Sequence, residues 1–318
     1  MAKPIEPYKC ALSLSNGILK AVSEISFKLG RLSLTQEHKA DVDDFVNATK
    51  ATLALEGIEL KPSEIRGLRQ GSPVPSAPLA TAVYNLYANM KRVDPFDPAF
   101  ITTFEQAIWK EGVPYRLSRR VASFPYPIPM HARVESLMKG LYTFAKGGRN
   151  KIHPLVLGCL YYFELMAIQP YSEYTGILAR YLLKAFLGTY QANLLCLPLE
   201  HAFLLRKDKL DAAYSEAVEK ADTGPFVNAV LVIINDGIDT LQRRAVKKSP
   251  TQSPLVRRML EKMEEGRFYG AAELCELLGL KSRLGLQKNY LKPALEAGLI
   301  EMSNPVSRTD RTQRYRKK

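Results

Sequence analysis

Residues 153–180 read HPLVLGCLYYFELMAIQPYSEYTGILAR, and this stretch decides the fold. Its first half, residues 154–168, is an apolar run that contains a single carboxylate, Glu164. The run is shorter than the ~20 residues that cross a bilayer, so it predicts a helix buried on nearly all sides inside a protein core. A second apolar helix is expected over residues 174–187. The sequence therefore predicts a mainly α-helical protein.

The flanking sequence continues the helical pattern on both sides. Apolar residues recur at three- and four-residue steps through residues 12–29, and residues 41–55 predict a helix that ends at Gly57, where a left-handed C-cap is easy. Further helices are expected over residues 79–91, 98–111, 133–144 and onward to about 246. The exception is GVPYRLSRRVASFPYPIP at residues 112–129, whose short β-friendly pieces among Gly, Pro and Ser predict a small β-hairpin flap.

Basic charge is concentrated at the C-terminal end. Of a formal net charge of +13, a charge of +10 arises from the 18 Lys and Arg and the 8 Asp and Glu that follow residue 242. This asymmetry favours a polyanionic partner for the last quarter of the chain, nucleic acid being the first candidate, over a merely solvated basic end.

A polar segment with two prolines, KKSPTQSP at residues 247–254, is the best domain boundary. Beyond it we expect helices at 255–265, 269–278 and 282–297, then a strand at 299–302 that pairs with a last segment at 313–316. Three helices followed by a two-stranded ribbon is the order of a winged helix-turn-helix domain. Its third helix and the basic loop that follows supply the side chains suited to phosphates and base edges: Arg283, Gln287, Lys288, Lys292 and Arg311.

Four segments, in the right order, resemble the Fic (filamentation induced by cAMP) domain family. The central stretch resembles the Fic helix and its signature H-P-F-x-[DE]-G-N-[GK]-R-x-x-R, and TLALEG at residues 52–57 resembles the family's [ST]-x-x-x-E-[GN] inhibitory helix. PYRLSRRV at residues 114–121 is similar to the flap region. GLKSRLGLQKNYLKPALEAGLIE at residues 279–301 is similar to the winged helix that many bacterial Fic proteins carry.

The resemblance implies a Fic-fold helical bundle with a β-hairpin flap and a C-terminal winged helix. We divide the chain into an N-terminal helical region with the inhibitory-type helix (1–78), a Fic core (79–246) and a winged-helix domain (247–318). In the family, ATP and Mg²⁺ bind at the signature, and a histidine takes the proton of a target hydroxyl while AMP is transferred.

The signature departs sharply from the family at the positions that carry this chemistry. Gln169 stands at the histidine position, and an amide cannot act as a base at neutral pH. Ile177 replaces the first arginine, and Tyr174 and Thr175 replace the Gly-Asn pair. Each lost catalytic group is typically worth ~10²–10⁴ in rate, so ordinary AMP transfer is not expected.

Other family positions are retained. Glu173 keeps the acidic position that would hold Mg²⁺, Gly176 keeps a close backbone approach to phosphate, and Arg180 keeps the second arginine. These residues leave weak ATP binding open, against the alternative that Gln169 is only packed and hydrogen-bonded. The resemblance further implies that Glu56 pairs with Arg180, and that Thr52, Glu56 and Gly57 form the inhibitory segment.

Three functions stay open. The first is a regulatory Fic-type pseudoenzyme that binds DNA and retains a degenerate nucleotide site. The second is an enzyme that transfers AMP or another phosphate-containing group to a protein target by altered chemistry, and the third is an interaction or homodimerisation module. No secretory signal or membrane span is expected, the four cysteines lack metal spacing, and a cytoplasmic location follows.

Overall fold

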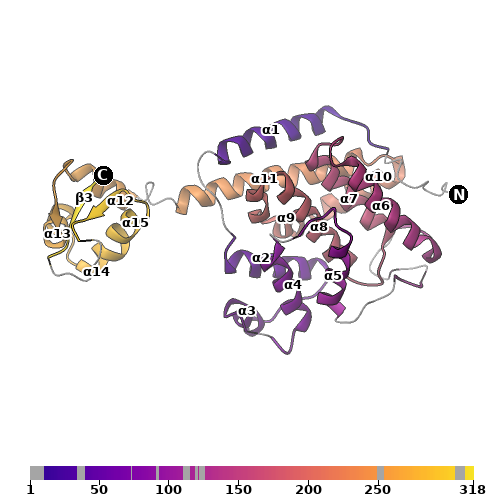
Figure 1. Ribbon diagram of the computed structural model, residues 1–318, viewed down its shortest axis with the longest axis horizontal. Helices are drawn as coiled ribbons and strands as arrows, with labels where there is room; N and C mark the ends of the chain where they lie inside the picture. Colours follow the sequence, from indigo (N-terminus) through magenta and orange to yellow (C-terminus); the bar gives the residue numbers. More distant parts are fainter. Residues whose placement is uncertain are drawn as a thin grey trace. The chain divides into compact units, whose positions relative to one another are not determined.

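The computed structural model describes residues 11–33, 40–72, 74–90, 93–109, 115–118, 121, 126–248, 254–304 and 312–318. Within these ranges the protein is mainly helical, with one small sheet (Figure 1). The chain divides into two compact units, Met1–Leu241 and Gln242–Lys318. The further predicted boundary at residue 78, inside the first unit, stays a prediction.

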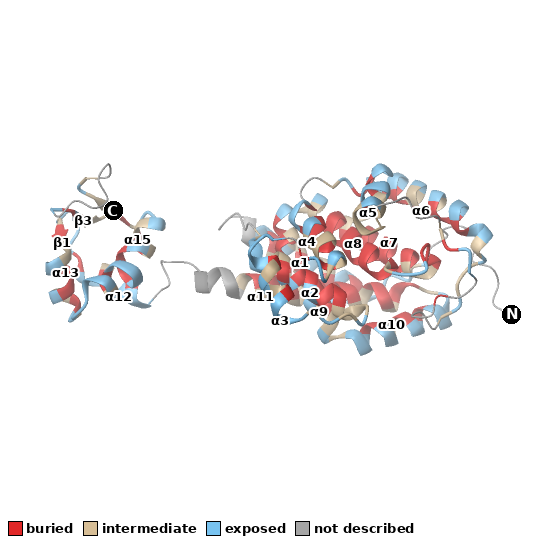
Figure 2. Ribbon diagram, turned by 90° about the horizontal axis from the view of Figure 1, so that it is seen from below, coloured by how far each residue is buried: buried red, intermediate tan, exposed pale blue. Residues whose placement is uncertain are grey.

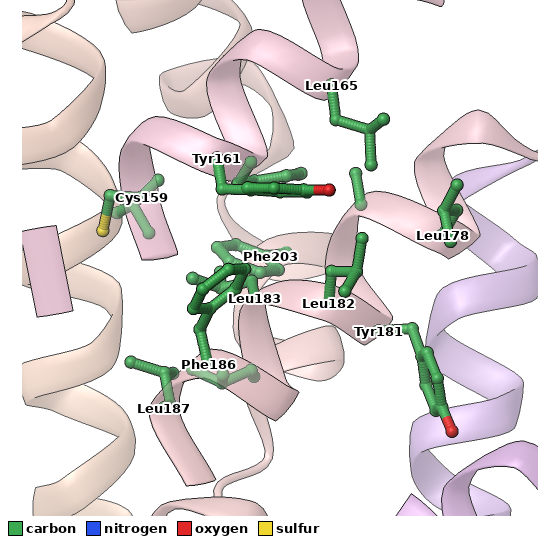
Figure 3. Packing of buried hydrophobic residues seen from close by; sticks show 14 of the residues in the cluster. Cys159, Tyr161, Leu165, Leu178, Tyr181, Leu182, Leu183, Phe186, Leu187 and Phe203 are labelled. Atoms are coloured by element: carbon green, nitrogen blue, oxygen red, sulfur yellow. The ribbon is translucent and has the colours of Figure 1, made fainter. Parts of the chain in front are cut away.

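Two buried helices form the centre of the first unit. Helix α7 (Pro154–Ile168) has the bounds of the apolar run, and α8 (Thr175–Tyr190) packs against it. Both helices are coloured as buried over most of their length in Figure 2. Figure 3 shows aromatic rings and leucines between the central helices, where the ring centroids of Tyr161 and Phe186 are 5.0 Å apart. The prediction of a central helix buried on nearly all sides is confirmed.

The remaining helices of the first unit surround this pair. Predicted and observed helices agree within a few residues, and the helix predicted over 133–144 extends through Gly148. A short helix at 62–69 is an addition that the sequence pattern does not predict. The helices are α1 (Asn16–Ser33), α2 (Val42–Leu55), α3 (Pro62–Arg69), α4 (Pro78–Ala88), α5 (Ala99–Trp109), α6 (Val134–Gly148), α9 (Leu199–Leu205), α10 (Lys207–Lys220) and α11 (Gly224–Lys248), with 3-10 turns η2 (His131–Arg133) and η3 (Ala192–Cys196).

Local signals account for both ends of α2. Asp41 and Asp44 form a reciprocal capping box at its start. The helix ends at Leu55, and Gly57 follows with φ +78°, the left-handed conformation expected there. The position of Glu56 is therefore fixed by the end of a well-capped helix.

Half of the predicted β-hairpin flap at residues 112–129 lies outside the described residues. The described parts of this segment, residues 115–118, 121 and 126–129, contain no strand. No helix of the described chain is long and apolar enough to cross a membrane.

The second unit has its own apolar core, centred on residues such as Val256, Met259 and Leu286. It contains α12 (Pro254–Lys262), β1 (Tyr269–Gly270), α13 (Ala271–Leu278), a third helix made of α14 (Arg283–Leu286), η5 (Gln287–Leu291) and α15 (Lys292–Glu296), then β2 (Ile300–Met302) and β3 (Arg314–Lys317). The third helix includes a π-turn just before Pro293, where the Lys292 N–H bonds to the Gln287 carbonyl.

The sheet of the second unit has three strands instead of the predicted two. The expected ribbon is present, with Glu301 opposite Arg316, but β3 also pairs with β1, so the strand order is β1-β3-β2 with antiparallel neighbours. The sequence pattern predicts that the second helix of this unit begins at residue 269. Instead, Tyr269 and Gly270 are extended, and Gly270 is the N-cap of α13, with its N–H bonded to Glu273.

His153 at the start of α7 makes the stability of the first unit depend on pH. Its Nδ1 accepts a hydrogen bond from the Leu155 N–H at 3.3 Å, which requires a neutral imidazole, and burial lowers the pKa of His153. Because the folded pKa lies below the unfolded one, stability is lost as pH falls below about 6.5. We expect His153→Asn, which keeps a capping acceptor, to reduce this loss in urea titrations between pH 7.5 and 5. His201→Asn, at an exposed position, is the control, and an identical pH dependence in all three proteins would contradict the assignment.

Candidate functional site

The turn between α7 and α8 contains two residues in the left-handed region. Gln169 (φ 46°) caps the C-terminus of α7, and Tyr174 (φ 61°) precedes α8. Neither residue is glycine, and the left-handed conformation costs ~1–2 kcal/mol for an ordinary side chain. Such conformations persist where the surroundings fix them and are common at functional sites. The turn therefore has a backbone conformation common at functional sites, and it leads into the N-terminus of α8.

Arg180 on α8 binds the end of α2. Its Nη2 is 2.6 Å from Glu56 Oε1, its Nε donates to Thr52 Oγ1 at 2.7 Å, and Nη2 also donates to the Thr52 carbonyl at 3.1 Å. The Arg180 side chain is 6% exposed. Burial alone would lower the pKa of Arg180, but Glu56 together with Tyr162 and Tyr87 outweighs burial, and the net pKa is raised. The predicted pair between Glu56 and Arg180 is confirmed.

The Glu56 carboxylate lies over the first turn of α8. A Cβ atom added at Gly176 would collide with Glu56 Oε1 and would come within 2.9 Å of Arg180 Nη1. Glu56 thus fills the space that the glycine leaves open at the helix N-terminus, where an anionic group is favoured. In this arrangement the site does not fit the phosphate chain of ATP, because a carboxylate is already there.

Gln169 turns its amide back to the helix that precedes it. Its Nε2 donates to the Met166 carbonyl at 2.9 Å, and the side chain is buried. The lone pair of an amide nitrogen is delocalised into the carbonyl group, so it does not accept a proton at neutral pH. The residue at the position of the expected base therefore completes the helix end and cannot deprotonate a hydroxyl.

Arg116, in the PYRLSRRV segment, supports this turn and was not singled out by the sequence. Its guanidinium donates to the carbonyls of Gln169, Ser118 and Pro129 at 2.6 Å each and to that of Ile168 at 3.2 Å. Its own N–H donates to the Pro170 carbonyl at 2.8 Å. Arg116 is 3% exposed, and burial lowers its pKa. The segment contains three arginines, and nothing in their spacing distinguishes Arg116.

A second buried ion pair follows one turn further along α8. Lys184 Nζ lies 3.0 Å from Glu200 Oε2 on α9, and the side chains are 6% and 1% exposed. Lys184 also lies over the ring of Tyr87, 5.2 Å from its centroid. Arg180 and Lys184 thus join α8 to α2 and to α9 through buried charges.

Aromatic side chains surround the turn. The Tyr171 hydroxyl donates to Glu105 at 2.5 Å, and Trp109 lies 4.9 Å from Tyr171 and 6.2 Å from Tyr174, measured between ring centroids. Trp109 is the single tryptophan of the chain, so its fluorescence reports on this turn. Glu173, the expected Mg²⁺ ligand, is exposed, and the described residues contain no cluster of three metal-ligating side chains.

A cavity of about 410 Å³ opens beside the turn, which is within the size range of small-molecule sites. Its wall contains most of the residues predicted for the nucleotide site. It also contains residues of α10 that the sequence does not single out, of which Lys207 and Asp211 form an ion pair at 2.7 Å. Burial raises the pKa of Tyr162 in its wall to about 12. The lining residues are Leu55, Glu56, Val121, Tyr126, Tyr162, Met166, Gln169, Glu173, Tyr174, Thr175, Gly176, Arg180, Phe203, Lys207, Leu210 and Asp211.

Four of the five residues predicted to contact DNA lie on the third helix of the second unit. Arg283, Gln287, Lys288 and Lys292 are all exposed. Lys292 is 4.0 Å from Glu296, at the limit of an ion pair. Arg311 lies outside the described residues.

Comparisons with known proteins find similarity to Fic family proteins. Residues 254–317 match the family model "Filamentation induced by cAMP protein Fic-like, C-terminal domain". A crystal structure of a Fic family protein from Desulfovibrio desulfuricans G20 superposes with a TM-score of 0.65 and 24% sequence identity, covering 98% of both chains. No curated protein matches the chain. The C-terminal residues thus resemble the Fic-like C-terminal domain, and the chain shares its fold with a Fic family protein over nearly its whole length.

Proposed function

We propose that this protein is a regulatory member of the Fic family that does not transfer AMP and acts through a DNA-binding C-terminal domain. The observation that carries the proposal is the state of Gln169: at the position of the catalytic base, its amide is hydrogen-bonded back to Met166. Reaction of a target hydroxyl would need another base.

The surroundings of Gln169 support a closed site. Ile177, at the position of the first signature arginine, is 1% exposed and belongs to the core, so it offers no charge to a phosphate. The second arginine, Arg180, is held by Glu56 and Thr52. We propose that Thr52, Glu56 and Gly57 act as the inhibitory segment, and that the pair fastens α2 to the core.

The C-terminal unit supplies the argument for DNA. The order helix, strand, helix, helix, strand, strand is that of winged-helix domains, and we assign the unit to that class. Exposed Arg283, Lys288 and Lys292 follow one another along the third helix. Between residues 280 and 295 the sequence has no Asp or Glu, so no carboxylate on this helix opposes a phosphate backbone before Glu296. Cys159, Cys196 and Cys275 are buried thiols, which fits the cytoplasmic location that we propose.

Salt dependence tests the DNA assignment. With three lysines at phosphates (Lys281, Lys288 and Lys292), we expect log Kd to rise with log salt with a slope of about 3. Lys288→Ala should reduce this slope by about 1, whereas Lys209→Ala, which removes an exposed lysine of the first unit, should leave it unchanged. Fluorescence anisotropy with a labelled duplex measures both. Absence of binding at low salt would contradict the assignment and favour a protein-interaction module.

A second candidate function rests on the cavity. Its size and the positions of Glu173, Gly176 and Lys207 in its wall leave room for a small phosphate-containing ligand once Glu56 moves away. The corresponding activity would be transfer of AMP or a related group by altered chemistry, with Mg²⁺ held between Glu173 and the phosphates. Incubation with ATP labelled on its α-phosphate, followed by detection of labelled protein, separates this candidate from the first.

A further inference from the structure

One apolar side chain interrupts the basic face of the third helix in the C-terminal unit. Leu284 is 74% exposed, while the neighbouring Leu286 is completely buried. Gln287 and Lys288 follow Leu284 by three and four residues, so these side chains lie on the same face of the helix. All three side chains are exposed. Within the described chain, no carboxylate pairs with Lys288.

The opposite face fixes the helix against the domain. Leu286, Tyr290, Leu291 and Ala294 are 0–4% exposed and belong to the core of the C-terminal unit. Ser282 caps the helix start, with its Oγ accepting from the Gly285 N–H at 3.2 Å. Leu284 is therefore presented to solvent by an anchored helix and cannot turn inward without breaking this packing.

The chemistry of the exposed face matches the major groove. An arginine contacts guanine in two places, a glutamine contacts adenine in two places, and an apolar side chain contacts the C5-methyl group of thymine. Arg283, Leu284 and Gln287 supply one group of each kind. Lys288 and Lys292 supply charges for the phosphates on either side.

Resting on the proposed DNA-binding function, we propose that Leu284 reads the methyl group of a thymine in the major groove, so that the protein prefers a site containing A·T base pairs. Gln287, one helical turn away, contacts an adenine of the same or the adjacent base pair. A protein partner would use Leu284 as an apolar anchor instead, but the cations beside it favour a polyanion.

The test begins with a duplex selected by the full chain from a random-sequence pool. Each thymine of the selected duplex is then replaced in turn by deoxyuridine, which lacks only the methyl group. At one position we expect Kd to rise about fourfold, the effect of one buried methyl group. Leu284→Ala should show the same weakening on the thymine duplex and no difference between thymine and uracil. Leu205→Ala, which removes a leucine 73% exposed in the first unit, should keep the full difference.

The outcomes separate this inference from the function on which it rests. Salt-dependent binding without sequence preference, or with no effect of uracil at any position, would overturn the role of Leu284 and leave DNA binding standing. A thymine preference that persists in Leu284→Ala would also overturn it. If no duplex binds while Leu284→Ala changes self-association in sedimentation, both proposals fail and the face is a protein interface.

Discussion

Glu200→Gln is expected to lower the free energy of unfolding of the first unit by about 3–5 kcal/mol, because it leaves the Lys184 ammonium buried without its counter-charge. The two side chains are 6% and 1% exposed, so water cannot replace the lost partner. Urea unfolding followed by Trp109 fluorescence measures the effect in the unit that contains the pair, without a contribution from the C-terminal unit.

An exposed pair of similar geometry provides the control. Glu135 and Lys139 lie 2.7 Å apart on α6 with side chains 69% and 76% exposed, so Glu135→Gln should change stability by no more than ~0.5 kcal/mol. Replacing both partners, as Lys184→Met with Glu200→Leu, should recover most of the loss, because no buried charge then remains. Equal effects of Glu200→Gln and Glu135→Gln would show that Lys184 reaches water.

Arg116→Met is the second large effect that we expect, a loss of about 3 kcal/mol or more. Methionine keeps much of the apolar length but leaves the carbonyls of Ile168, Gln169, Ser118 and Pro129 without their shared donor, at ~1–3 kcal/mol for each buried group that finds no water. Arg116→Lys should fall between Arg116→Met and the wild type, because one ammonium cannot reach all four oxygens.

The emission of Trp109 distinguishes local from general damage in these variants. Trp109 lies against Tyr171 and Tyr174, so a turn that has lost Arg116 should change its emission under native conditions, before urea is added. Arg133→Met, at an exposed arginine, should change neither emission nor stability beyond ~0.5 kcal/mol. Wild-type stability in Arg116→Met would mean that the carbonyls are satisfied by water and that Arg116 does not hold the turn.

Much of the helical framework could be predicted because local signals specify it. The apolar run at 154–168 has the bounds of α7, and Asp41 and Gly57 mark the ends of the segment around α2. The strand β1 could not be predicted in this way. Two residues carry no periodicity, and Tyr269 and Gly270 become a strand only because β3, more than forty residues later, pairs with them.

The site was only partly accessible from sequence. The pair between Glu56 and Arg180, 124 residues apart, was expected through the family resemblance and not from any local pattern. The left-handed conformation of Gln169 and the role of Arg116 depend on contacts between distant segments. Lys184 within an apolar helix did carry a signal, since a buried charge needs a partner, but the sequence does not name Glu200 as that partner.

We expect the site at Gln169 to transfer no nucleotide even when Glu56 is removed. The most direct measurement is incubation of the full chain with Mg²⁺ and ATP labelled on its α-phosphate, alone and with a bacterial lysate, followed by detection of labelled protein. Wild type, Glu56→Gly and Arg180→Ala are compared, each shown to be folded by Trp109 fluorescence. We predict that neither wild type nor Glu56→Gly labels itself or any lysate protein above the Arg180→Ala background, because Gln169 is no base and Ile177 offers no charge. Label above that background in Glu56→Gly would contradict the claim and establish an active transferase restrained by its inhibitory helix.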